Sequence, residues 1–181
     1  CIYVKYNLFM SERAMILMSG GPDSFAAAKW AMSAGYNTKG VFFDAEHDVA
    51  KREYEFFQAQ TSYLDIDSDS IQVGETIESF DEGSTDPEHV FKGHGLNLFP
   101  FSAGITSSLA ISYANTCDIE TIVYGLHADD FRQSKEYSLT VLNSIFEAAN
   151  QAQVDIELEL PFAEYSKAEV VRRAKKWDIP L

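Results

Sequence analysis

The segment Ser19-Gly20-Gly21-Pro22-Asp23-Ser24 joins a short apolar run to a stretch rich in helix-forming residues. Because glycine lacks a side chain, Gly20 and Gly21 can take backbone conformations closed to other residues and let a ligand approach the backbone. The free N–H groups at the start of the following helix point to the same place and favour an anion there. The hydroxyls of Ser19 and Ser24 add two donors. The segment therefore predicts a phosphate-binding loop.

Asp23 is the unusual member of this loop, because a carboxylate repels a bare phosphate. It is either the N-cap of the helix or a ligand of a magnesium ion that bridges to the phosphates. Ser-Gly-Gly alone would also suit a tight turn with a helix cap. The string lacks the terminal Lys-Ser/Thr pair of the Walker loop, and the chain has no Gly-x-Gly-x-x-Gly dinucleotide motif.

Other polar residues follow the ends of predicted strands. Asp44 closes the strand 38–43 and is expected either to order the ribose or base of a nucleotide or to cap the next turn. Gly125 and Asp130 follow the strand 121–124. A carboxylate beside a triphosphate favours magnesium, so Asp130 is the second candidate metal ligand.

Lys167 lies in the first turn of a predicted helix, where a cation opposes the helix dipole. It is a candidate phosphate contact, and an exposed lysine is the alternative. Asp129 is expected to belong to a solvated acidic loop. His47 and His127 fall near strand ends and could face the pocket, but the four histidines of the chain have no metal-site spacing. The catalytic candidates are Asp23, Asp130 and Lys167, and the nucleotide-binding candidates are Ser19, Gly20, Gly21, Asp23, Ser24, Asp44 and Gly125.

Strands and helices alternate along the chain from Ala14 to Trp177. The predicted strands are 14–18, 38–43, 70–73, 121–124 and 154–160. The predicted helices are 25–34, 50–64, 103–116 and 139–152, followed by a last helix with Ser166 as N-cap and Glu169 completing a capping box. This alternation predicts a doubly wound α/β domain, a mostly parallel sheet with helices on both faces. In such sheets ligands bind beyond the carboxyl ends of the strands, where the strand order reverses.

Composition narrows the function classes. The chain has 181 residues, of which 46% are hydrophobic, enough for one domain with a core. Its formal net charge of -14 argues against attachment to nucleic acid or membrane by bulk electrostatics, and no segment has the length of a membrane span. Two cysteines are too few for a disulfide framework. We expect a leader or added stretch at 1–9, a single ATP-binding domain over 10–181 and a cytoplasmic location.

The Ser-Gly-Gly-x-Asp-Ser string between strand and helix resembles the pyrophosphate loop of the N-type ATP pyrophosphatase superfamily. The resemblance implies an adenine nucleotide alpha hydrolase-like, Rossmann-like three-layer sandwich. It also implies an ATP-dependent ligase that adenylates a carboxylate, amide or carbonyl oxygen and releases pyrophosphate. A nitrogen nucleophile, such as ammonia, would then displace AMP.

Within that superfamily the chain is most similar to the 7-cyano-7-deazaguanine synthase family of queuosine-type metabolism. The similarity rests on four segments: 41–44, 99–114, 125–130 and 161–180. It implies ATP with magnesium, a small acid or amide substrate, ammonia and a possible homodimer. It also implies a zinc site whose cysteines would follow the last helix. The chain stops at Leu181, which is expected to reflect either a truncated chain or a lost zinc site.

Two internal segments depart from the family pattern. Ser102-Ala103 stands where the family has Arg-Asn, and Ser134 to Ser138 replaces a Tyr-Pro-Asp-Cys-Arg run. Arginine binds carboxylates through a fixed pair of hydrogen bonds that serine and alanine cannot reproduce. We therefore expect a substrate other than 7-carboxy-7-deazaguanine, with Arg132 as the nearest cation that could compensate. A catalytically inactive nucleotide-binding module and a tRNA-modifying enzyme of the same superfamily remain the alternatives.

Overall fold

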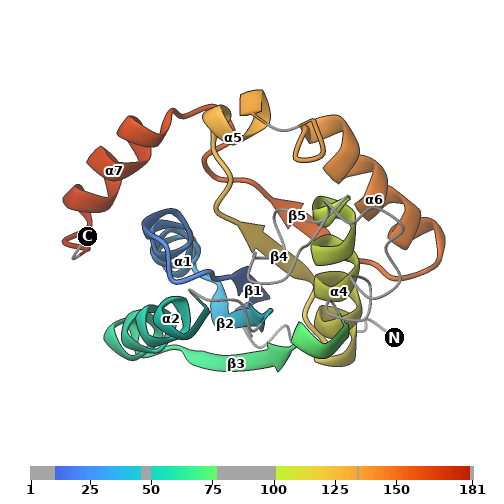
Figure 1. Ribbon diagram of the computed structural model, residues 1–181, viewed down its shortest axis with the longest axis horizontal. Coiled ribbons are helices and arrows are strands. Elements are labelled where there is room, and N and C mark those ends of the chain that lie inside the picture. Colours follow the sequence, from blue (N-terminus) through green and yellow to red (C-terminus); the bar gives the residue numbers. More distant parts are fainter. Residues whose placement is uncertain (1–10, 46–49, 77–100, 134, 180–181) are drawn as a thin grey trace, which may run out of the picture.

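The computed structural model describes residues 11–45, 50–76, 101–133 and 135–179. In this part of the chain five parallel strands form one sheet in the order β3-β2-β1-β4-β5 (Figure 1). The strands are β1 (Arg13–Leu17), β2 (Asn37–Asp44), β3 (Asp67–Gln72), β4 (Thr121–Tyr124) and β5 (Glu157–Glu159). The helices are α1 (Pro22–Ala34), α2 (Ala50–Leu64), α4 (Ser102–Thr116), α5 (Ala128–Gln133), α6 (Leu139–Gln151) and α7 (Lys167–Lys176).

Helices cover both faces of the sheet, as the alternating pattern predicts. Helices α1, α2 and α7 pack on one face, and α4 and α6 pack on the other (Figure 1). Successive residues of a strand point to opposite faces. Accordingly Ile16 belongs to the first core cluster and Met15 to the second, and both are fully buried. The predicted doubly wound three-layer fold is confirmed.

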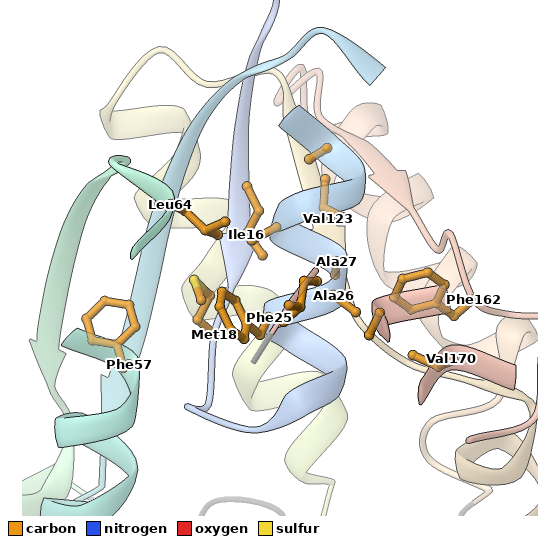
Figure 2. Packing of buried hydrophobic residues seen from close by; sticks show 14 of the residues in the cluster. Ile16, Met18, Phe25, Ala26, Ala27, Phe57, Leu64, Val123, Phe162 and Val170 are labelled. Atoms are coloured by element: carbon orange, nitrogen blue, oxygen red, sulfur yellow. The ribbon is translucent and has the colours of Figure 1, made fainter. Parts of the chain in front are cut away.

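Helix α1 lies close to the sheet because its inner face consists of small residues. Ala26, Ala27 and Ala28 are fully buried. Figure 2 shows Ala26 and Ala27 of α1 between Phe25 on one side and Phe162 of the β5–α7 connection on the other. This packing fixes the first turn of α1 beside the end of β1, so both ends of the loop between them are held in place.

Strand β3 begins at Asp67, three residues before the predicted strand 70–73. Two further differences from the sequence prediction have identifiable reasons. Strand β5 is shorter than 154–160, because the N–H of Val154 bonds to the Ala149 carbonyl and the N–H of Ile156 bonds to the side chain of Asn150. These residues complete the end of α6 instead of pairing in the sheet. The segment after β4 was expected to be a polar strand end, but residues 128–133 form the short helix α5.

Candidate active site

The predicted phosphate loop lies where the strand order reverses. Strand β1 pairs with β2 on one side and β4 on the other, and Leu17 is in register with both Val41 and Tyr124. From β1 the chain proceeds outward through β2 and β3, then crosses to β4 and β5. The loop that follows β1 is therefore at the crevice in which parallel α/β sheets bind ligands.

The two loop glycines have different roles. Gly20 has φ +73°, and a Cβ at this position would overlap the carbonyl oxygen of Glu53 in α2. Gly21 has φ -78° and ψ 164°, an extended conformation that any residue can adopt. Among the described residues, a Cβ on Gly21 would meet only the Ser19 hydroxyl oxygen, at 3.2 Å. Gly20 therefore uses the conformational freedom of glycine, whereas Gly21 does not and instead keeps space open at the loop.

Hydrogen bonds within the loop use some of the donors expected to bind phosphate. The Ser24 hydroxyl donates to the Gly21 carbonyl at 3.1 Å and accepts the Ser19 N–H at 3.3 Å. Ser24 thus closes the loop internally, whereas Ser19 is exposed. The Gln60 amide, which belongs to α2, donates a hydrogen bond to the Gly20 carbonyl at 2.7 Å. Sequence analysis missed Gln60, although a buried amide on the apolar face of α2 is the signal that could have revealed it.

Asp23 is not the N-cap of α1. That position belongs to Gly21, which makes no side-chain cap. The Asp23 carboxylate instead accepts a hydrogen bond from the Lys167 ammonium at 2.9 Å. Its other oxygen, Oδ1, is buried and has no hydrogen-bond partner among the described residues. Asp23 is 22% exposed and Lys167 55%, so the pair lies at the surface of the site with one carboxylate oxygen left for a ligand.

The His127 side chain lies between the two candidate metal ligands. The imidazole is buried, with Nε2 3.9 Å from Asp23 Oδ2 and Nδ1 3.2 Å from Asp130 Oδ2. The same Asp130 oxygen accepts the His127 N–H at 2.8 Å and thereby caps α5. Each carboxylate thus faces a different nitrogen of one ring. In this structure His127, which sequence analysis expected near the pocket, lies between Asp23 and Asp130, and its buried Nδ1 makes no hydrogen bond to the described residues.

The α5 segment also holds the first turn of α7. Asp129 accepts the Lys167 backbone N–H at 2.9 Å, and this hydrogen bond is the main reason that the pKa of Asp129 is lowered. Its other oxygen pairs with Arg132 at 2.9 Å. Asp129 therefore has defined partners, contrary to the expectation of a solvated acidic loop. It fixes the backbone from which the Lys167 side chain reaches Asp23.

Gly125 and Asp44 both have structural contacts at this edge. A Cβ on Gly125 would lie 2.8 Å from the Asp23 carbonyl oxygen and 3.0 Å from the Ser24 nitrogen. Gly125 therefore lets the end of β4 approach the first turn of α1. The Asp44 carboxylate accepts a hydrogen bond from Gln72 at 3.2 Å, which joins the ends of β2 and β3. Their contacts with a nucleotide remain predictions.

The two segments that depart from the family pattern meet in space. Glu136 accepts hydrogen bonds from the Phe101 N–H at 2.9 Å and from the Ser102 hydroxyl at 3.3 Å. Arg132, the cation expected to compensate, is 74% exposed and paired with Asp129. The described residues contain no group of three or more metal-ligating side chains that could hold an ion. His47, Pro100, Ser134 and Pro180 lie outside the described residues.

Solved structures with the same fold include two synthetases. The NMN synthetase from Francisella tularensis superposes with a TM-score of 0.63 at 17% identity, covering 95% of this chain and 64% of that one. The NH3-dependent NAD synthetase from Campylobacter jejuni gives a TM-score of 0.65 at 16% identity, covering 94% of this chain and 66% of that one. The sheet and the loop at its switch point thus define the adenine nucleotide alpha hydrolase fold.

Sequence comparison identifies the family within that fold. Residues 13–181 match the family model described as "Queuosine biosynthesis protein QueC", and the chain belongs to this family. The 7-cyano-7-deazaguanine synthase of Nautilia profundicola is 27% identical over 180 residues, covering 94% of this chain and 81% of the relative. The 7-cyano-7-deazaguanine synthase of Haloarcula marismortui is 26% identical over 191 residues, covering 93% of this chain and 78% of the relative. The family indicates an ATP-dependent ligase with a small-molecule substrate.

Proposed function

We propose that this chain transfers AMP from ATP to an oxygen of a small acid or amide and then joins the activated carbon to nitrogen. The observation that carries the proposal is the open Gly21 position at the end of β1, beside the first turn of α1. A helix N-terminus and extended glycine backbone favour phosphate at this point. The pyrophosphate end of ATP is assigned to residues 19–24, with Asp44 and Gly125 at the neighbouring strand ends.

The residues around the loop suit a magnesium ion. Mg²⁺ is usually held by one or two carboxylates together with substrate phosphates. The unpartnered, buried Oδ1 of Asp23 fits such a ligand, and Asp130 is proposed as the second carboxylate. Bound there, magnesium would neutralise charge on the pyrophosphate leaving group. Lys167 would exchange its contact with Asp23 for one with phosphate. The zinc site implied by the family resemblance has no proposed ligands here.

The chemistry needs positioning and charge neutralisation more than a covalent residue. The substrate oxygen bonds to the α-phosphorus while the bond between the α- and β-phosphates breaks, and pyrophosphate leaves with the electron pair. Ammonia or another amine then adds to the activated carbon, and AMP departs. The proposed setting is cytoplasmic. Across the described residues no helix is long and apolar enough to cross a membrane.

The reacting substrate is proposed to differ from 7-carboxy-7-deazaguanine. Ser102 and Ala103 are buried at the start of α4 and carry no charge that could pair with a carboxylate. A desolvated carboxylate without such a partner is unfavourable. The proposed reacting group is therefore another carboxylate, an amide or a urea-like oxygen in the same deazapurine-type metabolism. Arg132 would have to leave Asp129 to compensate.

The test is pyrophosphate release from ATP and magnesium, measured with and without ammonia and an added acid or amide. Acceptor-dependent release by the wild type, and its loss in Gly21→Val, are the expected results. Efficient nitrile formation from 7-carboxy-7-deazaguanine would overturn the substrate assignment, and its loss in Arg132→Ala would identify the compensating cation. Tight ATP binding with no turnover on any acceptor would instead indicate a nucleotide-binding module.

A further inference from the structure

Gln60 is a polar residue on the buried face of α2, where its neighbours include Phe57 and Leu64. It is only 9% exposed. Its amide oxygen Oε1 is buried and has no hydrogen-bond partner among the described residues. A buried polar atom without a partner costs stability, and an apolar side chain on this face would avoid that cost. Folding alone therefore does not account for the amide.

The contacts that the amide makes are with the phosphate loop. Its nitrogen Nε2 lies 2.7 Å from the Gly20 carbonyl oxygen and 3.5 Å from the Gly21 carbonyl oxygen. The loop also packs against α2, since a Cβ on Gly20 would overlap the Glu53 carbonyl and lie 3.1 Å from the Phe56 Cβ. Glu53, Phe56 and Gln60 have the spacing of one helix face. This face of α2 therefore supports the loop.

The peptide between Gly20 and Gly21 can take two orientations. A trans peptide is planar, so the Gly20 carbonyl and the Gly21 N–H point in opposite directions. Turning this plane over changes ψ of Gly20 and brings φ of Gly21 from -78° to a positive value. Glycine accepts positive φ as readily as negative φ, so the backbone itself does not prevent the turn. Another group must select one orientation.

The two orientations differ in what they offer a phosphate. In the structure the Gly20 carbonyl faces Gln60, and the Gly21 N–H faces the exposed Ser19 hydroxyl, whose oxygen lies 3.4 Å away. A backbone N–H on this outer side of the loop favours an anion. The opposite orientation would place a carbonyl oxygen there, which repels phosphate. The orientation of one peptide thus decides whether the loop has a donor or an acceptor at this point.

We propose that Gln60 is a positioning residue of the nucleotide site. Its hydrogen bond to the Gly20 carbonyl holds the peptide so that the Gly21 N–H faces the pyrophosphate end of ATP. Gln60 lies behind the loop and acts through the loop backbone. The inference rests on the proposed function, which assigns the pyrophosphate to residues 19–24, and goes beyond it by naming a residue of another helix that orients the loop.

Gln60→Met tests the hydrogen bond, because methionine has a similar length and no N–H donor. Affinity falls by the factor by which the competent orientation is depopulated. For loss of one hydrogen bond the affinity for Mg·pyrophosphate should fall by about 2- to 10-fold. The melting temperature should stay close to that of the wild type, because the unpaired Oε1 is removed as well. Gln58→Met, an exposed change on the same helix, is the matched control and should alter neither.

A comparison of ligands separates orientation of the loop from general packing. The affinity of Gln60→Met for Mg·ATP should fall by the same factor as that for Mg·pyrophosphate. The affinity for AMP, which lacks the β- and γ-phosphates, should not change. Gln60→Leu, which also lacks the donor, should give the same pattern and guards against a packing defect peculiar to methionine. An equal fall in AMP affinity in both variants would overturn the inference.

A crystal structure of ligand-free Gln60→Met shows the orientation directly. The Gly20 carbonyl should turn away from α2 or occupy two orientations. If the wild type binds Mg·ATP, then unchanged pyrophosphate affinity in Gln60→Met, or the wild-type carbonyl orientation in its crystal structure, would overturn the inference alone. Absence of both Mg·ATP and Mg·pyrophosphate binding to the wild-type chain would instead overturn the proposed function, and this inference with it.

Discussion

The adjacent glycines of the phosphate loop should separate folding from nucleotide binding. A Cβ on Gly20 would overlap the Glu53 carbonyl while the backbone keeps φ +73°, whereas Gly21 is extended and its nearest atom is a hydroxyl oxygen at 3.2 Å. Gly20→Ala is therefore expected to destabilise the fold. Gly21→Val is expected to fold normally and to lose ATP binding, because its side chain occupies the space assigned to phosphate.

The magnitude follows from two contributions. The left-handed conformation costs a residue with a Cβ about 1–2 kcal/mol, and forcing a methyl group against packed backbone costs about 1–3 kcal/mol. Gly20→Ala should thus lose about 2–5 kcal/mol of a stability that is typically about 5–15 kcal/mol. For a chain of this length each kcal/mol lowers the melting temperature by about 2–4 °C.

Thermal unfolding and calorimetry with Mg·ATP, performed on both variants, check this prediction. Gly20→Ala should melt about 4–20 °C below the wild type, and Gly21→Val should melt close to it while showing no measurable ATP binding. If folded Gly21→Val binds ATP with wild-type affinity, the loop is not part of the ATP-binding site. An equal loss of stability in both variants would refute the distinction between the two glycines.

Three further predictions concern the surroundings of the loop. Asp23→Asn, and likewise Asp130→Asn, should weaken ATP binding far more with magnesium than without it, and an equal loss in both conditions would indicate a structural role. Gly125→Ala should lower the unfolding free energy by about 1–3 kcal/mol in urea titrations, since its Cβ would press on the first turn of α1; unchanged stability would show that β4 can move away. The hydrogen bond from the Ser166 hydroxyl lowers the pKa of Glu169, so its contribution to stability is present above the unfolded pKa of about 4.3 and is lost as pH falls through the lower folded pKa. In Glu169→Gln this loss of stability at low pH should be absent when the melting temperature is measured against pH. Parallel curves of melting temperature against pH for the variant and the wild type would contradict the capping role.

Much of the fold follows from local sequence patterns. Helix α2 has the predicted bounds 50–64, and β4 has the predicted bounds 121–124, because apolar periodicity and buried runs set both. Glu169 accepts the Ser166 N–H at 2.8 Å, as the predicted capping box requires. These features depend on residues that are close together in the chain.

The contacts that organise the site were beyond sequence reasoning because they join distant segments. Gln60 supports the loop from another helix, and the loop and Lys167 meet through Asp23 across 144 positions. The approach of Gly125 to α1 and the hydrogen bonds that Glu136 accepts at the start of α4 depend on the same tertiary packing. The sequence shows the residue types, and only the fold shows which of them face each other.

The most direct test of the account is the fate of ATP labelled at the α-phosphorus, incubated with the full chain, magnesium, ammonia and either 7-carboxy-7-deazaguanine or its carboxamide. The account predicts AMP and pyrophosphate in equal amounts with the carboxamide, little of either with 7-carboxy-7-deazaguanine, and neither product from Gly21→Val. Formation of ADP and phosphate, or the same AMP yield from Gly21→Val, would contradict cleavage at the Ser19–Ser24 loop. ATP that binds but stays intact with the carboxamide would contradict ligase activity on an amide oxygen of this compound class.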